Sequence, residues 1–203
     1  MALLLIASVD SKLLVLVELL CENFEPLLKE AFRFCEGLKV PSVQNQAKIS
    51  WQRVTQEPSF IIESDFYLLD SMAFLTHYSL SELHYLLGFL NSKAIFYYFK
   101  HIGHLYSDKG FLLSNQYVER FPIPKTSSIN PQIHNDIMDC VAEILKLKKQ
   151  DSLSDTKELE NHLDFLIYQI YDLNDEEINL IESEFANRGG VIENIYHLLE
   201  SFM

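Results

Sequence analysis

Two stretches in the second half of the chain carry apolar residues at the same helical spacing. In each stretch, apolar positions recur at intervals of four, three, four and three residues, which puts them on one face of a helix. They are Ile133, Ile137, Cys140, Ile144 and Leu147 in the first stretch, and Leu159, Leu163, Leu166, Ile170 and Leu173 in the second. Because only a short polar break at 149–154 separates them, the pattern predicts an antiparallel helical hairpin.

Capping residues predict where helices begin in this half. Asn130 followed by Pro131 is typical of an N-cap with proline at the first helical position. A third, shorter helix is predicted to begin after Asn174, where Glu177 completes an analogue of the capping box. Its inward-facing positions are Ile178, Ile181 and Phe185. The glycine pair at 189–190 ends it, and a last helix is predicted for 191–200.

The first half shows a mixture of strand and helix patterns. Short β-branched and aromatic runs with turn residues between them favour strands at 48–53, 59–69 and 74–78. Residues 13–36 are predicted to form one weakly amphipathic helix, with a break at Pro26.

One long helix is predicted between these strands and the C-terminal half. A capping box at 79–82 opens it, and it runs to about residue 100 and closes near Gly103. Because it is apolar nearly all round, we expect it to be buried on several sides. Asn91 and Ser92 interrupt a run of leucines, and we expect their side chains to hold a neighbouring strand or loop by hydrogen bonds.

The charge of the chain changes sharply at a pair of prolines. Pro122 and Pro124 restrict their own backbones and those of their predecessors, so this stretch cannot be helical throughout. Beyond it, residues 126–203 hold five basic and 16 acidic side chains, a net charge of −11 out of −13 for the whole chain. Residues 39–125 hold eight basic and seven acidic side chains, a net charge of +1. Two regions with different roles are indicated.

Composition excludes several classes of protein. A hydrophobic fraction of 48% excludes a disordered chain. Cys21, Cys35 and Cys140 are far apart, so the cysteines indicate neither a disulfide framework nor a thiolate zinc site and fit a reducing compartment. Asp10 and Lys12 interrupt the apolar N-terminus, and no stretch reaches the roughly 18 apolar residues of a membrane span. We expect a cytoplasmic protein.

Catalytic patterns are weak. The glycines are single except at 189–190, so there is no phosphate-binding loop. His101 and His104 have ligand spacing only on a helix, and an interaction with a helix C-terminus explains them better. Acidic-x-Lys triplets at 10–12 and 155–157 match half of a nuclease site but lack a paired acid. We expect no catalytic centre and no metal site in this chain; a small hydrolase is disfavoured.

An ordered set of motifs carries a resemblance to a known family. The set comprises a Leu-Asn-Ser step at 90–92, a tyrosine-containing segment at 113–120, a Pro-x-Pro step at 122–124, and a closing Tyr-x-Leu-x-x-x-Glu pattern within 168–178. Over about 48–182, this order resembles the TaqI-like C-terminal specificity domain of type IIG restriction–modification adenine methyltransferases. More distantly, it is similar to the target-recognition domains of type I restriction specificity subunits.

The resemblance implies an organisation and a function. It implies an α+β fold in which a mixed strand/helix DNA target-recognition domain, 48–124, is followed by an antiparallel helical scaffold, 125–203. Residues 1–47, an N-terminal helical segment, lie outside it. The chain has no Asn-Pro-Pro-Tyr motif, so S-adenosylmethionine and Mg²⁺ are expected only in a methyltransferase/nuclease domain or subunit that this module directs to double-stranded DNA.

Candidate DNA contacts follow from the same resemblance and from side-chain chemistry. Cations position a protein on phosphates, whereas amides and hydroxyls read base edges in the major groove. Candidates for phosphate contact are Lys48, Arg53, Lys100, Lys109 and Arg120, and candidates for base reading are Gln52, Ser114, Asn115 and Gln116, with Arg53 also able to contact guanine. The short polar loop at 106–110 suits entry into a groove.

A second hypothesis assigns the chain no DNA-binding role. In it, the hairpin at 131–173 is a protein-interaction module that forms a homodimer, and 48–124 is an aromatic-rich core. That region is indeed aromatic: 15 of the 25 aromatic residues of the chain lie between Phe60 and Phe121.

Overall fold

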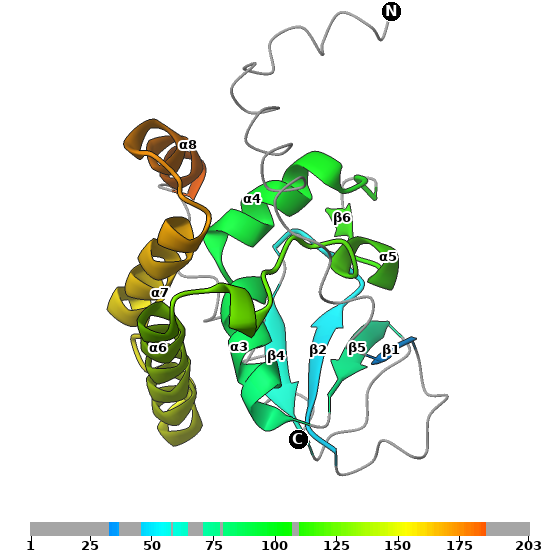
Figure 1. The fold of residues 1–203 in the computed structure, drawn as a ribbon. Coiled ribbons are helices and arrows are strands. Elements are labelled where there is room, and N and C mark those ends of the chain that lie inside the picture. The colour runs from blue at the N-terminus through cyan, green and yellow to red at the C-terminus, as the bar shows by residue number, and fades with distance from the viewer. Residues whose placement is uncertain are drawn as a thin grey trace, which may run out of the picture.

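The structure is a computed structural model that describes residues 33–36, 46–57, 59–64, 71–77, 79–106 and 110–185, the first of these ranges by its backbone. The predicted α+β class is confirmed. A four-stranded antiparallel sheet forms one layer, with the strand order β1-β5-β2-β4 (Figure 1). Its strands are β1 (Arg33–Glu36), β2 (Lys48–Gln52), β4 (Phe60–Glu63) and β5 (Met72–Thr76).

A second, smaller sheet continues from the end of β2. It pairs β3 (Val54–Thr55) with β6 (Phe111–Leu112) in antiparallel register. The indole Nε1 of the buried Trp51 donates a hydrogen bond of 2.9 Å to the carbonyl of Leu113 and so links the two sheets.

Helices pack against the four-stranded sheet and account for most of the described residues in the second half of the chain. They are α3 (Leu80–Leu90), α4 (Lys93–Ile102), α5 (Asn115–Val118), η3 (Thr126–Ser128), α6 (Pro131–Gln150), α7 (Lys157–Ile170) and α8 (Asp175–Phe185). In Figure 1, α3 lies between the sheet and the α6–α7 hairpin. Helix α3 contacts β2 and β4 on one side and α6 on the other, which agrees with its prediction as a helix buried on several sides.

The helix predicted for 79–100 is two helices. Ser92 interrupts it, because its hydroxyl accepts a hydrogen bond from the Ile95 backbone N–H and caps α4. Asn91, as expected, holds a neighbouring strand: its Oδ1 accepts from the Phe60 N–H at 3.0 Å and its Nδ2 donates to the Phe60 carbonyl at 2.9 Å. These contacts reach 31 residues back along the chain, so helical periodicity alone does not reveal the break.

The predicted helix ends at Gly103, Asn130 and Asn174 are confirmed, whereas the capping box predicted at 79–82 forms only in part. Ser79 Oγ accepts from the Glu82 N–H at the start of α3, but the Ser79 N–H donates to His77 Nδ1 at 3.1 Å and not back to Glu82. Gly103 ends α4. Asn130 Oδ1 accepts from the Gln132 N–H at 2.8 Å at the start of α6. At α8 the capping box is reciprocal: Asn174 Oδ1 accepts from the Glu177 N–H, and the Glu177 carboxylate accepts from the Asn174 N–H.

The prediction for the N-terminal region is wrong where the structure describes it. Arg33–Glu36 is the strand β1, which pairs antiparallel with β5, and not the end of a helix. A partner strand satisfies its backbone groups, and this pairing outweighs the weak amphipathic pattern. The rest of the 13–36 prediction, the end of the 59–69 strand, and the 189–200 predictions lie outside the described residues.

One buried cluster spans both halves of the chain. It contains Leu83 of α3, Trp51 of β2, and Ile137, Ile167 and Ile181 of the three C-terminal helices. Helices α3 and α6 approach so closely that a Cβ added at Gly88 would lie 3.0 Å from a Val141 methyl. The boundary predicted at 124/125 therefore separates two regions of different charge that share a hydrophobic core.

Two buried tyrosines hold the proline step. The Tyr171 hydroxyl donates to the Pro122 carbonyl and the Tyr85 hydroxyl donates to the Pro124 carbonyl, each at 3.0 Å. Burial raises the pKa of both tyrosines, which keeps them protonated as donors. The segment thus leads into η3 and α6 along a fixed path.

Candidate nucleic-acid interface

Backbone hydrogen bonds bring two of the predicted DNA-contacting segments together. The Leu113 N–H donates to the Arg53 carbonyl at 2.8 Å, next to the bond from Trp51 to the Leu113 carbonyl. Gln52 is the last residue of β2 and Arg53 follows it, whereas Ser114 occupies the N-cap position of α5 and Asn115 begins that helix. Residues separated by about 60 positions in the sequence therefore meet at one end of the sheet. We call Gln52, Arg53, Ser114, Asn115, Gln116 and Arg120 the reading cluster.

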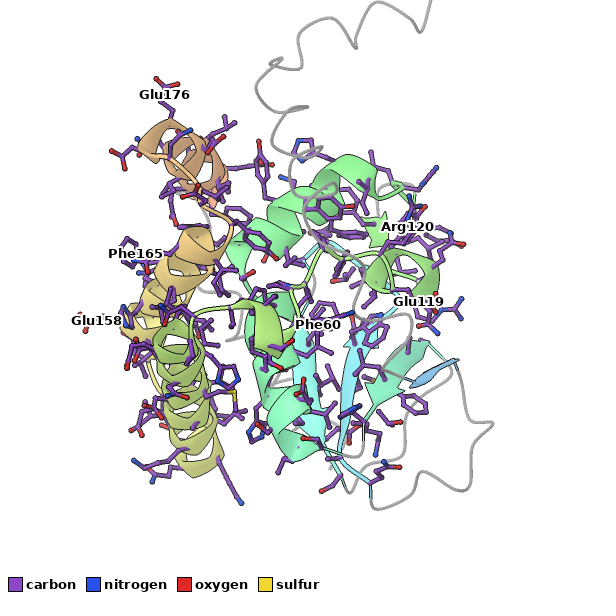
Figure 2. All side chains as sticks on the ribbon, viewed as in Figure 1. Phe60, Glu119, Arg120, Glu158, Phe165 and Glu176 are labelled. Atoms are coloured by element: carbon purple, nitrogen blue, oxygen red, sulfur yellow. The ribbon has the colours of Figure 1, made fainter. Side chains whose placement is uncertain are left out.

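The members of the reading cluster differ in exposure. Gln52, Gln116 and Arg120 are exposed, and Arg53 is half-buried. Figure 2 shows Arg120 and Glu119 at α5, above and below this helix in the view. These side chains offer one exposed guanidinium and two exposed amides, the groups that bind phosphates and read base edges.

Ser114 and Asn115 are placed differently from their exposed neighbours. The Ser114 Oγ and Asn115 Oδ1 atoms are buried, and within the described part of the chain neither has a hydrogen-bond partner. Buried polar atoms without a partner are uncommon in folded proteins. Among residues 114–116, Gln116 is the one whose side chain is exposed to solvent.

A hairpin next to the reading cluster presents apolar side chains to solvent. Leu105 pairs with Phe111, and the Tyr106 N–H donates to the Gly110 carbonyl at 2.6 Å. Leu105 is 73% and Tyr106 51% exposed. The sequence indicates this loop through its flanking glycines but does not reveal that these two side chains are exposed.

Gly110 sets the base of this hairpin. Its φ is +109°, a conformation that favours glycine, and an added Cβ would lie 2.4 Å from the Thr55 carbonyl oxygen. Phe111, the next residue, packs its ring 5.5 Å from that of Phe99. The hairpin is therefore fixed at its base against β3 and α4.

Two of the predicted phosphate contacts lie outside the reading cluster. Lys48 is at the other end of β2 and only 4% exposed; its ammonium lies 4.0 Å from Glu63 Oε1 and donates to the Ser64 carbonyl at 3.4 Å. Lys100 forms an ion pair with Glu184, at the contact between α4 and α8. Both cations are engaged within the fold, because a buried charge needs a partner of opposite sign. Lys109 lies outside the described residues.

The two histidines with ligand spacing each have a different partner. His101 Nδ1 lies 2.7 Å from the Tyr97 carbonyl, and His104 Nδ1 forms a short hydrogen bond with the Tyr117 hydroxyl. In the described ranges, no group of three histidine, cysteine, aspartate or glutamate side chains has a geometry that could hold a metal ion.

No protein-family model matches the chain, and no curated protein matches it significantly. None of the helices in the described ranges combines the length and the apolar character that a membrane crossing requires.

Proposed function

We propose that this protein is a sequence-specific double-stranded DNA recognition module of a restriction–modification system. It directs an N6-adenine methyltransferase/endonuclease, as a domain or a separate subunit, to its site. Catalysis, S-adenosylmethionine and Mg²⁺ belong to that partner, and the module acts in the cytoplasm where the DNA is. The proposal rests on the family resemblance of 48–182.

The observation that carries the proposal is the meeting of two segments at the end of the four-stranded sheet. The Leu113–Arg53 hydrogen bond joins the backbones of two segments, 52–53 and 113–120, whose side chains include amide and guanidinium groups. These are the chemical groups that contact phosphates and base edges, and they lie in the half of the chain that is close to neutral.

The charge distribution supports the same orientation on DNA. Figure 2 shows Glu158 on α7 and Glu176 at α8 on the side of the view away from Arg120. An acidic surface repels the phosphate backbone, so it restricts binding to the reading cluster. A nearly neutral reading surface also predicts weak binding by the module alone and stronger binding together with its partner.

A salt titration with selected DNA tests the proposal. The full-length protein first selects duplexes from a randomised pool, and these duplexes then serve as the ligand. If the module alone enriches none, the selection is repeated with the partner present. We expect one sequence to be enriched and its binding to weaken steeply with salt. In a Lys109→Ala, Arg120→Ala double variant, the slope of log K against log salt should fall by about two.

A matched pair of lysines in the acidic half provides the control. Lys146 and Lys149 are both exposed on α6, so a Lys146→Ala, Lys149→Ala variant removes the same charge away from the reading cluster. It should leave the slope unchanged. Homodimers in solution without measurable DNA affinity at low salt, alone or with the partner, would instead favour the protein-interaction function.

Base reading is tested separately from phosphate contact. Gln116→Ala removes an exposed amide and leaves every positive charge in place. It should relax the preference at one base pair, by about 1–3 kcal/mol, with an unchanged salt slope. The same selection repeated with the variant measures this preference. A variant that keeps the wild-type preference would exclude Gln116 from base reading.

A further inference from the structure

An ionic cluster joins α8 to the start of α4. The Lys93 backbone N–H donates to Asp164 Oδ1 of α7 at 2.8 Å, and the Lys93 ammonium lies 3.4 Å from Asp164 Oδ2. The same ammonium lies 3.0 Å from Glu182 Oε2 of α8. One lysine thus connects three helices through two carboxylates.

The cluster holds more negative than positive charge when both carboxylates are ionised. Among the described residues, two neutral groups also bind the cluster: Asn161 Oδ1 accepts from the Lys93 ammonium at 3.1 Å, and the Tyr168 hydroxyl donates to Glu182 Oε1 at 2.8 Å. The neighbouring pair between α4 and α8, Lys100 with Glu184, is already balanced. Two carboxylates therefore share one ammonium.

The two carboxylates differ in burial, and ionisation costs more free energy for the more buried one. The Asp164 side chain is 8% exposed, that of Lys93 23%, and that of Glu182 41%. Burial raises the pKa of Asp164 to about 7, although the Lys93 N–H and ammonium lower it. Glu182 raises it further through charge repulsion.

We propose that the cluster of Lys93, Asp164 and Glu182 is a proton-sensitive joint that tightens the docking of α8 on α4 when Asp164 is protonated and loosens it when Asp164 is ionised. A neutral Asp164 still accepts the hydrogen bond from the Lys93 backbone N–H, and the Lys93 ammonium then pairs with Glu182 alone. An ionised Asp164 competes for the ammonium and repels Glu182.

The direction of the pH dependence follows from proton linkage. Undocking of α8 removes Glu182 and admits water to Asp164, so the pKa of Asp164 is lower in the undocked state than in the docked state. The docked state therefore binds the proton more tightly, and docking is strongest in acid. Docking weakens as the pH rises toward about 7 and is constant above it.

Amide hydrogen exchange of the full-length protein tests the joint without DNA. Protection factors of α8 are measured from about pH 5.5 to about pH 8, after correction for the intrinsic exchange rate, relative to those of α6. We expect α8 protection to fall by up to about tenfold per pH unit below about pH 7 and to level off above it. Parallel changes in α6 would indicate global unfolding, and not undocking of α8.

Three variants identify the group responsible. Asp164→Asn keeps an acceptor for the Lys93 N–H and should make α8 protection independent of pH. Glu182→Gln removes the competing carboxylate and should make the dependence weaker; it also provides a second test if Asp164→Asn does not fold. Asp139→Asn removes an exposed carboxylate of α6 and should retain the wild-type profile.

Two results would contradict the proposal that this cluster controls the docking of α8. One is wild-type α8 protection that does not change with pH relative to α6. The other is a wild-type pH profile retained in Asp164→Asn. Because neither measurement involves nucleic acid, neither result bears on the proposed DNA-recognition function.

Discussion

The α6–α7 hairpin and the reading cluster are built in opposite ways. The hairpin consists of helices of 20 and 14 residues whose apolar seams face the core. The reading cluster stands on strands of two residues and a helix of four, α5. The hairpin also belongs to the acidic region 126–203, whose net charge is −11 against +1 for residues 39–125; residues 131–170 themselves hold eight acidic and four basic side chains.

This difference suggests that the hairpin provides stability and the reading cluster provides recognition, although both pack on one core. Long helices acquire their structure from local hydrogen bonds and a continuous apolar face. The short elements of the reading cluster keep their positions only through contacts such as the bond from Trp51 to Leu113. Substitutions in the hairpin should therefore act on the whole fold, and substitutions around the cluster should act locally.

The largest effect is expected from Ile137→Ala, which removes a fully buried side chain of α6 from the shared core. It should lower the free energy of unfolding by about 2–5 kcal/mol. Trp51, the single tryptophan, reports on the sheet by fluorescence, while circular dichroism reports mainly on the helices. Because the halves share a core, both signals should shift together in denaturant. Separate transitions would show that the halves unfold independently. Asp139→Ala, on the exposed face of α6, is the control.

Gly110→Ala should disturb the region of the reading cluster more than the hairpin. A Cβ at this positive φ meets the Thr55 backbone, so the cost is about 1–3 kcal/mol. We expect hydrogen-exchange protection to fall in β3 and β6 before it falls in α6 and α7. DNA binding should weaken with it. Gly88→Ala is the matched substitution on the other side of the core, in α3 facing α6, and equal losses in both variants at β6 would contradict a local effect.

Asn91→Ala tests the connection between the helices and the edge of the sheet. It leaves the Phe60 N–H and carbonyl without the side-chain amide that binds both, at a cost of about 1–2 kcal/mol. Thermal unfolding measures the loss. Asn135→Ala, an exposed asparagine of α6, should leave the melting temperature unchanged. A null result at Asn91 would show that water replaces the amide there.

The smallest effect is expected on the acidic surface. Lys146→Ala breaks an exposed ion pair with Glu143, whose N–O distance is 2.9 Å. Such pairs three residues apart on a helix contribute at most about 0.5 kcal/mol. The free energy of unfolding in urea should change by less than this amount, and the change should vanish at high salt. A larger loss would mean that surface charge, and not the apolar seams, holds the hairpin.

Local patterns determined the helical half of this protein. The caps at Asn130 and Asn174 and the spacing of the two seams involve residues within a few positions of one another, so the sequence displays them directly. The α+β class and the strands predicted at 48–53 and 74–78 also follow from local composition, although the structure places these strands at 48–52 and 72–76.

Only the tertiary structure decided the rest. The Ser92 cap at the break between α3 and α4 is local, but the contacts that fix this junction are distant: Asn91 binds Phe60, 31 residues before it, and the Lys93 N–H binds Asp164, 71 residues after it. The burial of Lys48 and the pairing of β1 with β5 likewise depend on strands that are distant in the sequence. A residue's exposure and partners are properties of packing between distant segments. The sequence predicted that Asn91 holds a neighbouring strand or loop and proposed Lys48 as a phosphate contact. Only the structure shows that the residue held by Asn91 is Phe60 and that Lys48 is buried beside Glu63.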